Sequence, residues 1–173
     1  MTAAVTLILG GAASGKSAYA ENLCISSGKP KAYWATSQVL DDEMRAKVDK
    51  HLKQRGPGWK TFEEPFDAAS VLGLLSADQI CLVDCATMWL TNHLLAGHDL
   101  EAETEALLQA IDACAAELVI VTNETGLGIV PENALARRFR EAQGRLNIAL
   151  AARADTVVQV TAGLPLVLKG ALQ

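Results

Sequence analysis

Short apolar runs alternate with longer amphipathic segments along this chain of 173 residues. The runs are rich in β-branched residues and most lack strict alternation, which is typical of strands covered on both faces. They predict strands at residues 5–9, 31–35, 80–84, 118–122 and 156–160. The segments between them predict helices at residues 16–27, 41–55, 66–76, 86–96, 102–117 and 132–153. This alternation predicts one α/β domain over residues 1–173, with a mostly parallel sheet flanked by helices.

The C-terminal segment departs from the alternation. Residues 156–170 hold two strand-like runs separated by Gly163-Leu164-Pro165, which has the composition of a turn. This pattern predicts a hairpin that adds one antiparallel strand at an edge of the sheet. Because ligands of such sheets bind at the carboxyl ends of the strands, we expect the functional site there.

The first predicted strand runs directly into a glycine-rich turn. The pattern is Gly10-x-x-x-x-Gly15-Lys16-Ser17, with a predicted helix after it, which is the order of a P-loop. The glycines let successive backbone N–H groups point at phosphate oxygens, and the helix presents its positive end to the same anion. We expect Lys16 to bridge the β- and γ-phosphates and the Ser17 hydroxyl to bind Mg²⁺. A chance glycine turn is the alternative, but the strand and helix around it favour the P-loop.

A second magnesium ligand is expected where the strand at residues 80–84 ends. Asp84 closes this apolar strand, the place where P-loop proteins hold an acid on the Mg²⁺ side. An aspartate there also serves as a turn former or helix cap, and Thr87 is an alternative cap for the next helix. The P-loop favours the metal role for Asp84.

The second predicted helix carries a candidate nucleophile, His51. This histidine shares a helical stripe with Met44 and Val48, so a packing role is one interpretation. Lys50 and Lys53 supply cations that can hold a phosphate chain beside the imidazole and keep it unprotonated. A neutral imidazole attacks phosphorus to form a phosphoramidate. The spacing alone leaves both roles open.

Residues 122–147 form a second informative segment. A polar TNE sequence ends a strand, and the glycine loop TGLGIVP after it suits substrate contact or a moving lid. The helix that follows carries arginines that we expect to form a solvated basic face with Glu132 and Glu141. These arginines are Arg137, Arg138, Arg140 and Arg145. His93 and His98 are expected in a helix and a loop, with no assigned role.

Composition and charge narrow the class of protein. Half of the residues are apolar and the formal net charge is −5, so the overall field opposes nucleic acid and anionic membranes. We therefore expect no nucleic-acid partner. The N-terminal apolar run lacks a basic region and is too short to cross a bilayer, so no membrane span is expected. The cysteines form no C-x-x-C pair and predict reduced, mostly buried thiols in a cytoplasmic protein. They are Cys24, Cys81, Cys85 and Cys114.

Three blocks occur in order along the chain: GGAASGKS, ATSQVLDDEMRAKVDKH and TNETGLGIVPENALARRFREAQGRLNIALAARAD. Together they closely resemble the bifunctional adenosylcobinamide kinase / adenosylcobinamide-phosphate guanylyltransferase family of cobalamin biosynthesis, over essentially the whole chain. The resemblance implies a RecA-like P-loop NTPase with two reactions. ATP or GTP first phosphorylates the aminopropanol hydroxyl of adenosylcobinamide. GTP then guanylylates a histidine, and the substrate phosphate displaces that histidine to give adenosylcobinamide-GDP.

The resemblance also implies roles for residues at matching positions. It makes His51 the guanylylated histidine, Glu63 and Asp84 nucleotide-site acids, and the active form a homo-oligomer, specifically a trimer. Mg²⁺ would lie on Ser17 and Asp84. The remaining nucleotide-binding residues it implies are Gly10, Gly11, Ala12, Ala13, Ser14, Gly15, Lys16, Ala35, Thr36, Ser37, Leu52, Lys53, Gln54 and Arg55.

Two positions depart from the family pattern. Many relatives have arginine where Ala13 stands, and some have glutamate where Asp84 stands. Neither change removes a group that the chemistry requires. Two other functions remain open: a P-loop small-molecule kinase without nucleotidyl transfer, and a non-catalytic GTP-binding module. Against the module, the chain lacks the N-K-x-D tetrapeptide of signalling GTPases, since TNET has Glu124 in place of lysine.

Overall fold

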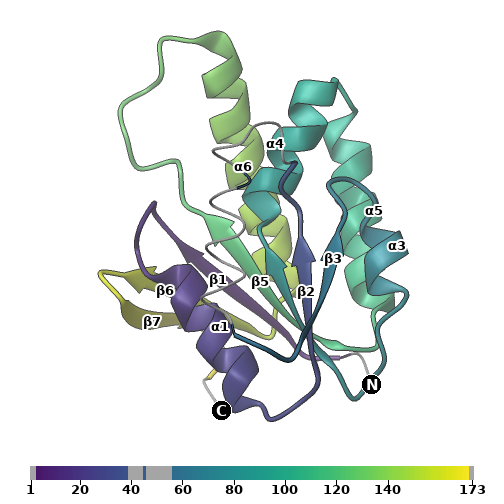
Figure 1. Cartoon of the computed structure of the whole chain (residues 1–173). Coiled ribbons are helices and arrows are strands. Elements are labelled where there is room, and N and C mark those ends of the chain that lie inside the picture. Colours follow the sequence, from purple (N-terminus) through teal and green to yellow (C-terminus); the bar gives the residue numbers. More distant parts are fainter. Residues whose placement is uncertain (1–2, 39–44, 46–55, 172–173) are drawn as a thin grey trace.

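The computed structural model describes residues 3–38, 45 and 56–171 (Figure 1). These residues form one sheet whose strands are β1 (Val5–Gly10), β2 (Lys31–Ala35), β3 (Trp59–Glu63), β4 (Ile80–Asp84), β5 (Glu117–Asn123), β6 (Thr156–Thr161) and β7 (Leu164–Lys169). The strand order is β3-β2-β4-β5-β1-β6-β7. Strands β1 to β6 pair in parallel, and β7 pairs antiparallel with β6. The expected parallel sheet with a C-terminal antiparallel strand is thus confirmed.

The described helices lie on both faces of the sheet. They are α1 (Lys16–Ser26), α3 (Ala68–Leu72), α4 (Ala86–Ala96), α5 (Leu100–Ala113) and α6 (Ala134–Arg153). Helix α1 packs on the face that carries Ile8 and Leu82, where Ala20 and Cys24 are fully buried. The other four helices cover the opposite face. Except for residue 45, the expected helix at residues 41–55 lies outside the described residues.

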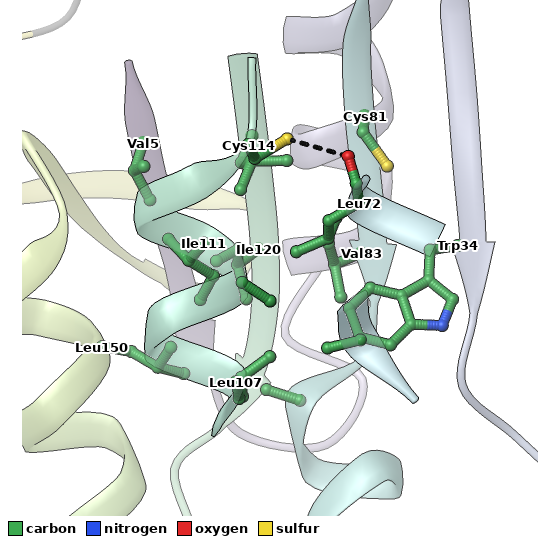
Figure 2. Close-up of a cluster of buried hydrophobic side chains, with 14 of the residues drawn as sticks. Val5, Trp34, Leu72, Cys81, Val83, Leu107, Ile111, Cys114, Ile120 and Leu150 are labelled. Carbon is green, nitrogen blue, oxygen red and sulfur yellow. Dashed lines mark hydrogen bonds between the residues drawn. The ribbon is translucent and has the colours of Figure 1, made fainter. Parts of the chain in front are cut away.

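The larger half of the core lies between the sheet and the α3, α4, α5 and α6 layer (Figure 2). Trp34 and Val83 project from the sheet towards Leu107 of α5 and Leu150 of α6. The Cys114 thiol donates to the carbonyl of Leu72 at 3.7 Å, which joins the end of α5 to α3 (Figure 2). This close packing of apolar side chains holds the strands in one register and so keeps their carboxyl ends rigid.

Several boundaries differ from those expected. Strand β3 was not expected at all, and the helix expected at residues 66–76 is only the five residues of α3. Helix α5 begins at Leu100 instead of residue 102, because the Asp99 carboxylate accepts from the N–H groups of Glu101 and Ala102. Helix α5 ends at Ala113, and Glu117, which was expected to be the last residue of the helix, is the first residue of β5.

The hairpin turn is also displaced from its expected position. Ala162 and Gly163 form the turn, with φ angles of 52° and 77°. Leu164 and Pro165 belong to β7 and pair with Thr161 and Val160. Two residues with positive φ match the twist of a tight hairpin, and a proline is tolerated on an edge strand. The glycine that indicates this turn in the sequence, Gly163, is therefore the second residue of the turn.

Two further expectations concern cysteines and membranes. All four cysteines are free, and Cys24, Cys81 and Cys114 are buried while Cys85 is half-buried, which confirms mostly buried thiols. Within the ranges that the structure describes, no helix has both the length and the apolar character needed to cross a membrane.

Candidate active site

The carboxyl ends of the parallel strands meet at one edge of the sheet. The register aligns Glu63 with Ala35, Ala35 with Asp84, Asp84 with Val121, and Val121 with Ile8. Neighbouring strands are about 4.8 Å apart, so Asp84 lies about 10 Å from β1 along this row and Glu63 about 19 Å. Asp84 therefore stands beside the loop that follows β1, whereas Glu63 marks the far end of the same edge.

The loop after β1 depends on close backbone approaches. A methyl group on Gly10 would lie 2.5 Å from Ser14 Oγ and 2.6 Å from the carbonyl oxygen of Val160. Gly15 has a φ of 93°, and Ala13 also adopts a positive φ, of 54°. The N–H of Gly163 donates to the carbonyl of Ser14 at 2.8 Å, so the C-terminal hairpin holds the loop from one side. The sequence pattern places glycine where this curvature requires it.

Helix α1 begins in this loop and differs from its neighbours at the N-terminus. Its N-cap, Gly15, provides no side-chain hydrogen bond, and the first turn has no acidic residue. The other described helices are each capped by a side chain, namely Asp67, Cys85, Asp99 and Asn133. The first N–H groups of α1 thus have no side-chain partner, and an anion can take that place. This is the arrangement of a phosphate-binding loop.

Lys16 and Asp84 belong to two elements, α1 and β4, that pack against each other. Helix α1 packs on β4 and β5, which brings its first turn towards the end of β4. Burial and the neighbouring Asp84 carboxylate raise the pKa of the Cys85 thiol to about 11, while the Lys16 ammonium acts in the opposite direction. The Lys16 Nζ donates to the Gly11 carbonyl at 3.1 Å and is held over the loop.

The donor set at this point fits Mg²⁺. Ser17 lies in the first turn of α1 and offers a hydroxyl oxygen, and half-buried Asp84 offers a carboxylate. One oxygen of that carboxylate accepts from the Tyr33 hydroxyl at 3.0 Å, which orients the group. Mg²⁺ prefers oxygen ligands and keeps several waters, so one or two protein ligands beside phosphates are sufficient. The two residues expected to hold magnesium thus have the right ligand chemistry, and their joint binding of the ion stays a prediction.

The stretch Ala35-Thr36-Ser37 lies at the end of β2. Thr36 is fully buried; its hydroxyl donates to the carbonyl of Cys85 at 2.7 Å and accepts from the Cys85 N–H at 2.9 Å. Its side chain thus locks the end of β2 to the end of β4, while Ser37 is partly exposed. Nucleotide contact by this stretch and by Glu63 stays a prediction. His51 and Leu52 to Arg55 lie outside the described residues.

A buried polar network behind the site was not anticipated. The Thr122 hydroxyl donates to Asn147 Oδ1 at 2.7 Å, and the Gln143 amide donates to both of these residues. The Thr87 hydroxyl accepts from the N–H of Asn123 at 2.8 Å. Thr87 is therefore not the cap of α4; the Cys85 thiol takes that position. One feature of the sequence could have indicated this network. Gln143 and Asn147 are amides one helical turn apart on α6, and Thr122 ends the apolar run of β5.

Arginines of α6 hold the loop between β5 and α6. Arg140 donates to the carbonyls of Gly126 and Ile129, and Arg137 donates to the carbonyl of Pro131 at 2.9 Å. These two arginines therefore bond to loop carbonyls instead of pairing with Glu132 and Glu141, although Arg137 is exposed as expected. Arg145 does pair with Glu141 one turn away, as expected.

The loop at residues 124–133 extends from the carboxyl edge of the sheet beyond the P-loop (Figure 1). Its apolar side chains face solvent: Leu127 is 86% exposed and Ile129 is 96% exposed. Glu124 at its base donates its N–H to the carbonyl of Gly10, so the loop is joined to the end of β1. The candidate site thus combines the anion-binding loop after β1 with an apolar flank, the exposed loop at residues 124–133.

Solved structures with the same fold are known. The archaeal protein PH0250 from Pyrococcus horikoshii superposes with a TM-score of 0.59 at 10% identity, covering all of this chain and 90% of that one. An ATPase of a bacterial type III secretion system gives a TM-score of 0.58 at 9% identity, covering 91% of this chain and 51% of that one. These similarities confirm the expected fold.

Sequence relatives identify the family. The chain is 44% identical over 167 residues to the "bifunctional adenosylcobalamin biosynthesis protein CobP" of Pseudomonas aeruginosa, covering 95% of this chain and 96% of that protein. It is 41% identical over 180 residues to the CobU protein of the same description from Salmonella typhimurium, covering 94% and 98%. Residues 6–168 match the model of the family described as cobinamide kinase / cobinamide phosphate guanyltransferase. With its P-loop, its Asp84 and the family match over nearly its whole length, this chain belongs to the cobinamide kinase / cobinamide phosphate guanyltransferase family.

Proposed function

We propose that this chain catalyses two successive reactions on a corrinoid precursor. ATP or GTP phosphorylates the hydroxyl of adenosylcobinamide, and GTP then supplies GMP to the new phosphate to give adenosylcobinamide-GDP. The observation that carries this proposal is the uncapped, glycine-lined N-terminus of α1 next to Asp84, in a chain of this family. The apolar flank formed by the loop at residues 124–133 suits a large organic substrate.

The kinase step requires alignment and charge stabilisation. The N–H groups of the loop and of the first turn of α1 hold the β- and γ-phosphates, and Lys16 exchanges the Gly11 carbonyl for phosphate oxygens. Mg²⁺, when bound by Ser17 and Asp84, neutralises charge on the same oxygens. The substrate hydroxyl attacks the γ-phosphorus, and the bond to the β–γ bridging oxygen breaks.

The transferase step uses a protein nucleophile, for which we propose His51. Its neutral imidazole nitrogen attacks the α-phosphorus of GTP, and pyrophosphate leaves with the electrons of the broken P–O bond. A phosphate oxygen of the substrate then attacks the same phosphorus and releases the imidazole. This role rests on the resemblance of the block around His51 to the family, with Leu52 to Arg55 and Glu63 as further nucleotide contacts.

Labelling with GTP that carries radioactive α-phosphorus tests this division of labour. We expect wild-type protein to retain label that acid removes and base does not, as a phosphoramidate requires. His51→Ala should lose the label and guanylyl transfer while keeping part of the kinase activity. Equal labelling of the two proteins would overturn the assignment of His51, and absence of label from both would favour a kinase without nucleotidyl transfer.

We also propose a cytoplasmic homo-oligomer, with three subunits as the resemblance implies. The free thiols of all four cysteines support a reducing compartment. The outer strand β7 supports association, because all six of its residues are exposed and four of them are Leu or Val. An apolar edge strand of this kind is an interaction surface unless charges or a covering element protect it.

A further inference from the structure

Three potential metal ligands meet at the corner between α4 and α5, on the face of the sheet opposite α1. His93 lies in the last turn of α4, His98 in the connection, and Glu103 in the first turn of α5. The two Nδ1 atoms of the histidines are 2.9 Å apart. Oε2 of Glu103 lies 3.6 Å from Nδ1 of His93, and the other oxygen, Oε1, lies 3.9 Å from Nδ1 of His98. All three ligand atoms thus point into one small volume.

The His93 ring is oriented for coordination. Its side chain is only 2% exposed, and its Nε2 lies 3.3 Å from the carbonyl oxygen of Phe66. A carbonyl oxygen can only accept, so Nε2 carries the proton and Nδ1 presents its lone pair to His98 and Glu103. Metal-ligating histidines almost always donate their other N–H to such an acceptor. The rings of Trp89 and Phe66 pack against His93 with centroids 4.4 and 5.2 Å away and hold it in place.

The spacing of the three ligand atoms approaches that of a tetrahedral site. Ligands about 2.05 Å from a tetrahedral ion are about 3.3 Å from one another. The two Nδ1 atoms are 2.9 Å apart and approach different oxygens of Glu103, so a rotation of the carboxylate together with small shifts of the rings brings one of its oxygens towards this spacing. In the metal-free protein, the Nδ1–H of His98 donates to Nδ1 of His93. Metal binding requires the other tautomer of His98, so its Nδ1 loses the proton to solvent while its Nε2 takes one up from solvent, and two coordinate bonds replace the hydrogen bond.

The surroundings favour a divalent ion with one open position. The cluster borders a cavity of about 210 Å³, which Asp67 also lines, so water can reach the fourth position. Glu103 and Asp67 supply the negative charge that faces the ion. Two nitrogen ligands and one carboxylate suit Zn²⁺ and related transition metals and discriminate against Mg²⁺.

We propose that His93, His98 and Glu103 form a site for Zn²⁺ or a related divalent transition metal that clamps the corner between α4 and α5. The site is separate from the proposed catalytic reactions, since it involves neither the P-loop nor Asp84. Its ligands follow the pattern His-x4-His-x4-Glu. The ion ties the end of one helix to the start of the next and, through His93, to the Phe66 carbonyl.

Cobalt binding tests the proposal without any assay of enzyme activity. Metal-free full-length protein is titrated with Co²⁺ in excess Mg²⁺ and without nucleotide. We expect one Co²⁺ per chain, with the intense visible absorption of a four- or five-coordinate ion, and its displacement by one equivalent of Zn²⁺. Zn²⁺ should also raise the thermal midpoint by several degrees. Co²⁺ at the oxygen ligands of the P-loop site would be octahedral and almost colourless, so the two sites are distinguished.

Variants identify the residues that bind the absorbing Co²⁺ ion. His98→Ala and Glu103→Gln, both at partly exposed positions, should weaken Co²⁺ binding at least tenfold and abolish the Zn²⁺-dependent rise in midpoint. Glu101→Gln, on the same turn of α5, and His51→Ala should bind Co²⁺ as the wild type does. No absorption in the wild type, equal binding by His98→Ala and Glu103→Gln, or loss of binding in His51→Ala would overturn the site.

Discussion

Among the side chains that we propose stabilise charge in the kinase step, we expect Lys16 to have the largest effect. Its ammonium group donates to a neutral carbonyl, that of Gly11, and in the proposed mechanism it exchanges this carbonyl for phosphate oxygens when a nucleotide binds. Lys16→Ala should therefore lower kcat/KM for the kinase step by a factor equivalent to about 3–4 kcal/mol, the loss seen for a preorganised donor. Steady-state phosphorylation of cobinamide measures this change.

Lys29→Ala is the matched control for Lys16→Ala. It removes the same charge at the opposite end of the sheet, where Lys29 pairs with Glu117 at 2.6 Å. We expect its kinase activity to equal that of the wild type. A comparable loss of activity in both variants would mean that net charge, and not the contact of Lys16 with phosphate, sets the rate.

Residues whose position depends only on their neighbours in sequence could be predicted. The strand, turn and helix of the P-loop and the place of Asp84 at the end of β4 are of this kind, because these elements follow one another directly; the magnesium role of Asp84 stays a prediction. Thr36 is different: its partner, Cys85, is 49 positions away, and only the pairing of β2 with β4 brings them together. The network of Thr122, Gln143 and Asn147 was missed for the same reason, since the docking of α6 on β5 creates it.

The same limit holds for whole elements. Strand β4 and helix α4 have the predicted bounds, because one is a continuous apolar run and the other ends at Gly97, which has a φ of 74°. Strand β3 has the sequence WKTFE and lies at the edge of the sheet, where only Trp59 and Phe62 are partly covered. A half-exposed edge strand carries too few apolar residues to be recognised without its partner.

The loop between β5 and α6 is an element held in place by α6. Arg140 donates two hydrogen bonds to its backbone, at 3.0 Å to Ile129 and 2.6 Å to Gly126. Arg140→Ala should release the loop and raise the KM for cobinamide phosphate severalfold, because binding must then order the loop. Since the loop is exposed, the free energy of unfolding should fall by only about 1 kcal/mol.

Kinetics and urea unfolding of two variants separate this effect from a loss of charge. Arg138→Ala removes an arginine from an exposed position of the same helix and should leave the KM unchanged. If Arg140→Ala also leaves the KM unchanged, the loop does not contribute to substrate binding. If both variants raise it equally, the positive charge of α6 is the cause.

At the scale of the whole molecule, the two edges of the sheet differ. At one edge, β3 presents Lys60, Thr61 and Glu63 to solvent. At the other, β7 forms the outer strand (Figure 1), with Leu164 72% exposed and Leu166 60% exposed. The sequence predicted that β7 is an edge strand, but its exposure on both faces follows from how the helices are distributed over the sheet. An unprotected apolar edge favours association with another chain.

Leucines at alternate positions of β7 lie on one face of the sheet, so charges placed there should block association. Wild-type protein should have the mass of a homo-oligomer by light scattering, a trimer if the family resemblance extends this far. The double variant Leu166→Lys/Leu168→Lys should have the 18.3 kDa mass of one chain. Its stability should be little changed, because both side chains are already exposed in the single chain. Ile148→Lys, which charges an equally exposed position on α6, should remain an oligomer. A monomeric wild type at micromolar concentration, or an oligomeric double variant, would show that β7 is not the contact surface.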